Sequence, residues 1–299
     1  MRTKRLMSER PLHLMLLPAV IIVLVFSYGP IVGLTMAFQD FQPAKGWFGS
    51  PWVGLANFEF LFLLPGSMEA LRNTIYIAFL KGLFGLLTPL AVALMLNELR
   101  SIRYKRVLQT VLYLPHFLSW VILSGILIDV LSPASGLTSG IMRSLGLEPV
   151  FFLGDNRWFP IVAVGSDIWK EFGFNSVVFL AALTGIDPSL HEAAVMDGAG
   201  HLRRLWHITL PGLRNMLVML ALLNLGNILN AGFDQIFNLY SPVVYESGDI
   251  IDTFVYRIGI QDAQYGVAAA AGFFKSIVSM VLLSSSYWLA YKFADYRIF

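Results

Sequence analysis

The sequence contains no cysteine and little charge. A secreted scaffold built from disulfides is therefore excluded. Charged residues make up 13% of the 299 residues, against roughly 25% in a typical soluble protein. Apolar residues make up 57% and the mean hydropathy is +0.67, so the chain is far too apolar for disorder and too poor in charge to cover a soluble surface. The balance of 21 basic against 19 acidic residues gives no basic field for nucleic acid. The class of protein that this composition leaves is a polytopic membrane protein.

Long apolar stretches indicate where the chain crosses the bilayer. A transmembrane helix needs about 20 mostly apolar residues, because lipid offers no partner for the backbone. Six stretches qualify: 12–38, 70–96, 107–131, 159–184, 213–233 and 267–291. The first follows a basic segment, but its apolar run is too long for a signal peptide, so we interpret it as a retained anchor. The predicted fold is all-α, a single transmembrane domain over 1–299 with six transmembrane helices.

The distribution of Lys and Arg predicts the orientation. Thirteen lie in 1–11, 97–106, 185–214 and 292–299, the segments on one side of the predicted spans. On the other side lie four, namely Lys45, Arg143, Arg157 and Arg257. Because basic residues are enriched in cytoplasmic segments, both termini are predicted to be cytoplasmic.

The loop at 186–212, between the fourth and fifth predicted spans, carries the most specific pattern. Asp187 is a suitable N-cap, Pro188 suits the first helical position, and Ser189 with Glu192 offers an alternative capping box with the same result. Gly198 can end the helix, because glycine adopts the left-handed conformation. A second segment then runs to the start of the fifth span, so a helix-turn-helix outside the membrane is predicted.

The same loop resembles a known motif. Glu192, Ala193 and Ala194, followed by Gly198 and then by Ile208, Leu210 and Pro211, are similar to the EAA motif of permease subunits of ABC importers, at that family's spacing. The resemblance implies the type I permease fold and a loop that docks on a cytoplasmic ATPase subunit. The residues it assigns to this coupling are Glu192, Ala193, Ala194, Asp197, Gly198, Ile208, Leu210 and Pro211.

Other segments resemble carbohydrate importer permeases, in particular those that take up polysaccharide fragments such as alginate oligosaccharides. They are 51–58, 113–120, 167–170 and 251–257, and the likeness extends over about 12–292. It implies an ATP-driven importer of an oligosaccharide in the bacterial cytoplasmic (inner) membrane. The implied partners are a second permease subunit of the same fold, in a heterodimer or as a second copy, two ATPase subunits and an extracytoplasmic solute-binding protein. Membrane lipid surrounds the spans.

Motifs for catalysis are missing from the sequence. There is no G-x-x-x-x-G-K-[ST] loop for nucleotide phosphates, so ATP and Mg would be bound by the partner ATPase subunits and this chain would bind no cofactor. His191 and Glu192 begin an H-E-x-x-H zinc motif, but Val195 stands where the second histidine is needed. The five histidines are scattered, so no metal site and no catalytic residue is predicted. We expect a transport subunit rather than an enzyme.

Polar residues within two predicted spans are candidates for a substrate pathway. Charges there cost roughly 2.5–3.5 kcal/mol each on insertion scales, so they should face the bundle interior or a wet cavity. In the fourth span they are Asp167, Lys170, Glu171 and Asn175, on one helical face. Trp169 beside them is a candidate for stacking on a sugar ring. In the fifth they are Asn224, Asn227, Asn230, Asp234 and Gln235, also on one face.

Each group has a structural alternative. Asp167 and Lys170 are suited to pair with each other and hold helices together, and asparagines serve as hydrogen-bonding links between helices. Asparagine amides are equally suited to sugar hydroxyls. At the level of the whole protein, the alternative is a self-sufficient channel or an ion-coupled secondary transporter, with Asp129, Asp167 or Glu171 as the coupling site. An intramembrane enzyme would lack catalytic residues.

Overall fold

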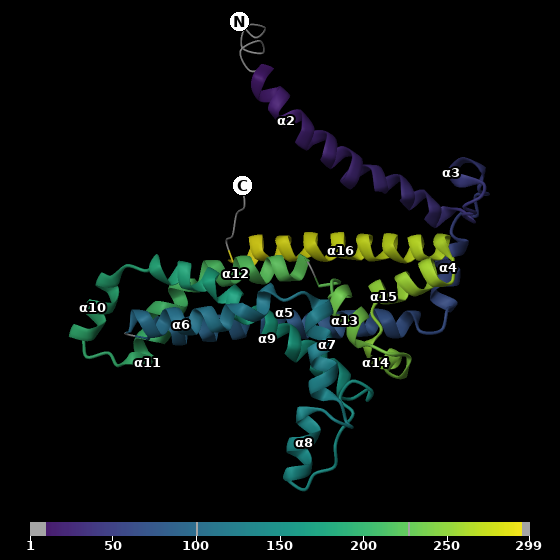
Figure 1. Ribbon diagram of the computed structural model, residues 1–299. Helices are drawn as coiled ribbons and strands as arrows, with labels where there is room; N and C mark the ends of the chain where they lie inside the picture. The colour runs from purple at the N-terminus through teal and green to yellow at the C-terminus, as the bar shows by residue number, and fades with distance from the viewer. Residues whose placement is uncertain (1–9, 100, 227, 295–299) are drawn as a thin grey trace, which may run out of the picture. The chain divides into compact units, whose positions relative to one another are not determined.

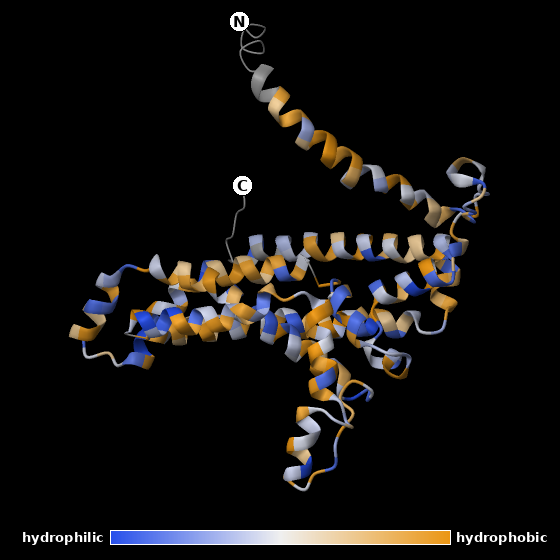
Figure 2. Cartoon of the chain, viewed as in Figure 1, coloured by the Kyte–Doolittle hydropathy of each residue, from blue (hydrophilic) through white to orange (hydrophobic). Residues whose placement is uncertain are grey.

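The computed structural model describes residues 10–99, 101–226 and 228–294 (Figure 1). The regular elements in these ranges are helices, and the only β-type pairing among the described residues is one isolated antiparallel bridge between Gln39 and Trp52. The all-α prediction is therefore confirmed. Apolar residues dominate α2 (Arg10–Val23) and α12 (Leu210–Gly226), whereas polar residues are prominent in α11 (His201–Arg204) (Figure 2). The described chain forms two compact units.

The first unit comprises the described part of Met1–Pro65 together with Val255–Phe274. Helix α2 continues without interruption through a π-helix, Leu24–Tyr28, and a 3-10 helix, Gly29–Phe38. Two short helices follow, α3 (Gly46–Gly49) and α4 (Ala56–Leu63). The Asn57 side-chain amide donates to the carbonyls of Ala37 at 3.0 Å and Gln39 at 2.9 Å, which ties α4 to the end of the first helical run.

The second unit comprises Gly66–Phe254 and the described part of Lys275–Phe299. Its helices up to the long loop are α5 (Ser67–Asn97), α6 (Ile102–Tyr113), the 3-10 helix Leu114–Phe117, α7 (Trp120–Leu131), α8 (Leu137–Ser144) and α9 (Phe159–Thr184). Then follow α10 (Pro188–Met196), α11, the π-helix Leu205–Thr209, α12, α13 (Phe233–Leu239), the 3-10 helix Pro242–Val244 and α14 (Tyr245–Gly248). Helices α15 (Ile251–Tyr256) and α16 (Tyr265–Ala294) each contribute residues to both units, and the π-helix Arg257–Gln261 between them lies in the first.

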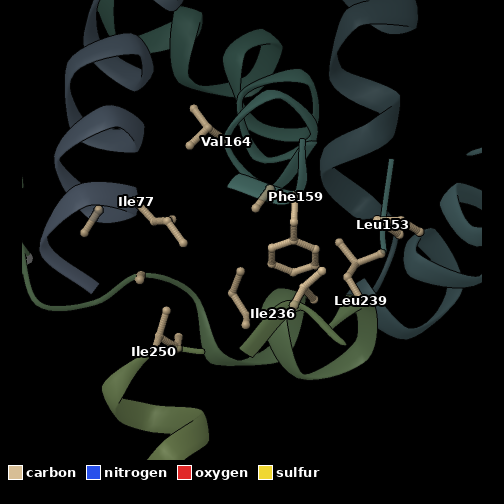
Figure 3. Packing of buried hydrophobic residues seen from close by; sticks show 11 residues of the cluster. Ile77, Leu153, Phe159, Val164, Ile236, Leu239 and Ile250 are labelled. Atoms are coloured by element: carbon tan, nitrogen blue, oxygen red, sulfur yellow. The ribbon is translucent and has the colours of Figure 1, made fainter. Parts of the chain in front are cut away.

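Two apolar clusters form the core of the second unit. In one, Ile77, Phe159, Ile236 and Ile250 are almost completely buried (Figure 3). In the other, Leu90 and Ala93 of α5 pack with Phe179 and Leu183 of α9 and Leu213 of α12. Helices α5 and α9 contribute residues to both clusters and therefore pack against each other over most of their length. This helix pair positions the polar residues described below.

Among the described residues, four helical segments are long and apolar enough to span a membrane, and two bent helix pairs raise the number to as many as six. The four segments are Leu14–Phe38, Ser67–Asn97, His201–Gly226 and Tyr265–Trp288. Three of them contain the predicted stretches 12–38, 70–96 and 267–291 almost completely. The predicted stretch 159–184 coincides with α9, which passes the test together with α10 across a bend of 69°.

The predicted span at 107–131 corresponds to the second bent pair, α6 with the following 3-10 helix and α7, and is not one continuous helix. Helical structure stops at Phe117, Leu118 is extended, and α7 starts after a bend of 100°. Ser119 is the N-cap of the new helix, with its Oγ accepting from the Ile122 amide at 3.4 Å. A capping serine supplies an acceptor for the freed amides, so the chain can begin a helix in a new direction here.

The predicted fifth span, 213–233, is likewise not one continuous helix. Helix α12 ends at Gly226, and α13 starts at Phe233 after Gly232, whose φ is +90°. A φ in the left-handed region interrupts a right-handed helix and suits glycine, which has no Cβ. The polar residues of this stretch are therefore divided between two helices and the segment joining them.

Candidate functional site

Helix α10 of the 186–212 loop starts and stops at the predicted residues. The Asp187 carboxylate accepts a hydrogen bond from the Ser189 amide at 2.9 Å, and Pro188 occupies the first helical turn. This hydrogen bond from the backbone lowers the pKa of Asp187. Asp187, and not Ser189, is thus the cap. The helix ends at Met196, and Gly198 takes the left-handed conformation with φ +75° while the Ala199 amide closes the turn on the Ala194 carbonyl at 2.8 Å.

The first half of the motif lies on the surface. Glu192, Ala193, Asp197 and Gly198 are exposed and Ala194 is half-buried, and none of the described residues of α10 is buried. Apolar side chains share this exposure: Met196 is 87% exposed, and Leu190, Val195, Leu202 and Trp206 are each more than half exposed. A capped helix that contributes nothing to the chain's own core, and presents small and apolar residues outward, has the character of a docking surface.

The second half of the motif supports the base of the loop. Ile208 and Leu210 are half-buried, and Leu210 packs with Ile186 against the cluster of Leu90 and Phe179. A cavity of about 500 Å³ lies beside them, and Pro211 lines it. The motif therefore combines an exposed helix with an anchored return into α12. His201 Nε2 lies 2.9 Å from Glu98 Oε2, which connects the loop to the end of α5.

A second candidate site is a cavity of about 350 Å³ bounded by α5, α9, the last turns of α12 and the segment before α13. We call it the polar cavity. Its lining residues are Ala78, Lys81, Gly82, Gly85, Asp167, Ile168, Glu171, Phe172, Asn175, Asn224, Asn230, Ala231 and Gly232. Asn175, Asn224 and Gly85 also line a smaller space of about 130 Å³ next to it. Five of the predicted pathway residues thus meet at one cavity: Asp167, Glu171, Asn175, Asn224 and Asn230.

Charge in the polar cavity is balanced by two separate ion pairs. Lys81 Nζ lies 3.2 Å from Asp167 Oδ1. Lys170 Nζ lies 2.9 Å from Glu171 Oε1 and donates to the His116 carbonyl at 2.8 Å. The structural alternative in which Asp167 pairs with Lys170 is therefore wrong. Asp167 pairs with Lys81 of α5, and Lys170 pairs with the adjacent Glu171. Asp167 and Glu171 face the cavity, while Lys170 is buried behind it.

His116 is a participant that the sequence did not single out. Its Nδ1 lies 2.7 Å from Glu171 Oε2, and its ring stacks on Phe174 with centroids 4.0 Å apart. His116 sits just before the bend between α6 and α7, so this contact attaches the bend to α9. Lys81 is a second participant whose partners the sequence does not indicate. The signal for both was a polar residue in an apolar stretch, but their partners are distant in sequence.

Four predicted pathway residues lie elsewhere. Trp169 is 46% exposed and Asp234 is exposed on α13, and neither lines the polar cavity. Lys170 and Gln235 are buried and make internal hydrogen bonds. Asn227 falls outside the described residues. Among the described residues, no group of three His, Asp or Glu side chains is placed to hold a metal ion.

Comparisons with known proteins agree on the kind of molecule. A model of the family "Binding-protein-dependent transport system inner membrane component" matches residues 81–295. A polygalacturonan/rhamnogalacturonan transport system permease protein, YteP, of Bacillus subtilis (strain 168) is 39% identical over 99% of this chain and 92% of its own. The crystal structure of a bacterial ABC transporter involved in the import of the acidic polysaccharide alginate contains a similar chain, with a TM-score of 0.90, 39% identity and coverage of 97% of this chain and 98% of that one. In a crystal structure of a bacterial alginate ABC transporter in complex with its alginate pentasaccharide-bound periplasmic protein, another chain matches with a TM-score of 0.88, 38% identity and 96% coverage of both.

Proposed function

The chain belongs to the family of binding-protein-dependent transport system inner membrane components, and we propose that it is a permease subunit of an ATP-driven oligosaccharide importer. It is a multi-pass membrane transport component with the fold of ABC importer permeases. The observation that carries the proposal is the 186–212 loop, in which a complete EAA pattern forms a capped, exposed helix on an anchored base.

ATP binding and hydrolysis are assigned to a partner. In the proposal, α10 docks on a cytoplasmic ATPase subunit through Glu192, Ala193, Asp197 and Gly198, all of which are exposed. The apolar side chains of the loop add contact area, and the Glu192 carboxylate is suited to a basic residue of the partner. ATP and Mg belong to two such ATPase subunits, and this chain binds no cofactor. The loop is cytoplasmic, as are both termini.

The polar cavity forms this subunit's share of the translocation pathway. Its volume of about 350 Å³ lies within the range of small-molecule sites, roughly 300–1,000 Å³. The amides of Asn175, Asn224 and Asn230 offer donors and acceptors to sugar hydroxyls. A second permease subunit of the same fold would complete the pathway, and an extracytoplasmic binding protein would deliver the substrate. The names of the relatives point to fragments of polysaccharides such as polygalacturonan, rhamnogalacturonan and alginate.

Reconstitution tests this function. The chain, its partner permease, the ATPase subunits and the binding protein are assembled in proteoliposomes with ATP inside and labelled oligogalacturonate or alginate oligosaccharide outside. We expect uptake that requires ATP and the loaded binding protein. Uptake by the permease subunits alone, driven by an ion gradient, would instead identify a secondary transporter or channel.

A further inference from the structure

The interrupted fifth span forms one wall of the polar cavity. Asn230, Ala231 and Gly232 lie in the break between α12 and α13, and all three line the cavity. A break within the hydrocarbon region leaves backbone carbonyls without helical partners, and such backbone persists where protein groups satisfy it. The groups that bind these carbonyls therefore determine where this wall stands.

Lys81 of α5 supplies a hydrogen bond to the break. Its Nζ donates to the Ala231 carbonyl at 2.7 Å, to Asp167 Oδ1 at 3.2 Å and to Gln235 Oε1. An ammonium group carries three donors, so each has an acceptor, one in the break, one in α9 and one at the start of α13. The Lys81 side chain is 9% exposed. One cation thus joins three elements at a single point.

The surroundings of Lys81 fit this arrangement. Gln235 is fully buried, and its amide donates to the Ala163 carbonyl at 2.7 Å and to Ser166 Oγ at 2.8 Å, which holds α13 against α9. Gly232 passes so close to the ammonium that a Cβ there would lie 2.9 Å from Lys81 Nζ. The backbone of the break therefore passes directly beside the cation. Glycine suits the φ of +90°, and a side chain there would force the Lys81 ammonium to shift.

We propose that Lys81 is a positioning residue: its ammonium fixes the break in the fifth span and thereby sets the place of Asn230 in the polar cavity. The effect on Asn230 as a sugar ligand rests on the proposed function, whereas the fixing of the break does not. The competing account is a buried ion pair in which Lys81 merely neutralises Asp167. The two accounts differ because positioning requires the donor to Ala231, while neutralisation requires charge balance alone.

A cysteine at position 231 reports directly on the break. Because the chain contains no cysteine, Ala231→Cys gives a protein with a single thiol. This thiol lies in the break, at a position that is completely buried. In the assembled complex we expect slow labelling by a water-soluble maleimide, and labelling about tenfold faster when Lys81→Met removes a hydrogen bond from a charged donor. Lys275→Met is the matched control, because Lys275 pairs with Asp252 at 2.5 Å and does not line the cavity. Ala93→Cys, equally buried in uninterrupted α5, should label at an unchanged rate.

The double variant Lys81→Met with Asp167→Asn separates the two accounts. It leaves no unpaired buried charge, so it also serves if the single variant fails to assemble. We expect labelling of Ala231→Cys to stay fast in the double variant. A return to the slow rate, or no acceleration in Lys81→Met, would overturn the proposal.

Transport kinetics give an independent readout. Lys81→Met should raise the KM for oligosaccharide several-fold more than it lowers the maximal rate, because Asn230 is displaced while the coupling loop is intact. A fall in the maximal rate with an unchanged KM would contradict positioning of the substrate ligand. Absence of saccharide import by the wild-type complex would refute the proposed function, while the labelling result would still stand.

Discussion

Two asparagines have the exposure and placement to contact substrate. Both are exposed and line the polar cavity, Asn224 from the last turns of α12 and Asn230 from the break before α13. Each lost hydrogen bond weakens binding by about 1 kcal/mol, so Asn224→Ala with Asn230→Ala together should raise the KM for uptake roughly thirtyfold. Asp234→Ala is the control, because Asp234 is exposed outside the cavity and should leave KM unchanged. Wild-type uptake by a stably assembled double alanine variant would exclude these contacts.

Asp187 stabilises the start of α10 in its ionised form. Because hydrogen bonding lowers its pKa below the ordinary 3.8, the contribution is complete above pH 3.8 and is lost as the pH falls through the lowered value. ATPase stimulation by the loaded binding protein should therefore show no step from Asp187 between about pH 5 and 8. Asp187→Ala should reduce stimulation throughout that range, whereas Asp187→Asn, also a good cap, should preserve it. A step in this range that Asp187→Asn abolishes would refute the assignment.

Residues that act through near neighbours were predictable, and those that act across the fold were not. The cap at Asp187 and the stop at Gly198 follow from side chains within a few positions. Lys81, by contrast, meets Asp167, Ala231 and Gln235 at separations of 86, 150 and 154 residues. The sequence indicates that a charge in an apolar stretch needs a partner. Which residue becomes the partner of Lys81 is decided only by the packing of α5 on α9.

At the scale of the element, two glycines of the EAA loop allow a matched test. Gly198 and Gly200 are both exposed, and a Cβ at either position would meet no atom within 4 Å. They differ in φ, which is +75° at Gly198 and −67° at Gly200. Alanine in the left-handed region costs about 1–2 kcal/mol, so Gly198→Ala should weaken the end of α10 and lower coupled uptake several-fold. Gly200→Ala should retain wild-type uptake in the same assay.

A change of Glu192 tests the docking surface rather than the helix. Glu192 is exposed and alanine is a good helix former, so Glu192→Ala should leave α10 intact. We expect normal membrane insertion but reduced co-purification with the ATPase and reduced uptake. A variant that co-purifies and transports at the wild-type rate would move the contact elsewhere on the loop.

Hydropathy located the membrane helices but missed their breaks. An average over about 20 residues is insensitive to two extended residues such as Leu118 and Ser119, or to a left-handed glycine such as Gly232. The polar residues predicted to share one face of a fifth membrane helix therefore do not lie on one helix. Helix α12 ends at Gly226, and Asp234 and Gln235 belong to α13. Caps and glycines within an apolar stretch are the signals that mark such positions.

At the scale of the molecule, orientation is the prediction that remains to be measured. Ser189 of the EAA loop and Ser144 of the 132–158 loop are both exposed and fall on opposite sides in the predicted topology. In intact cells, an impermeant maleimide should label Ser144→Cys, and Ser189→Cys should react after the membrane is opened. The reverse pattern would invert the topology and place the EAA loop away from any cytoplasmic ATPase.

The entry into α12 has a consequence for how such chains diverge. The π-helix at Leu205–Thr209 closes its turn with i→i+5 hydrogen bonds, so this turn holds one residue more than an α-helical turn would. Loss of one residue there would restore regular α-helix without turning the remainder of α12, so its cavity-facing asparagine would keep its aspect. Because the π-helix includes Ile208 of the EAA motif, such a loss would also shorten the spacing between Gly198 and Pro211 by one residue. Chains that keep the spacing of the motif are therefore expected to keep the π-helix at this turn.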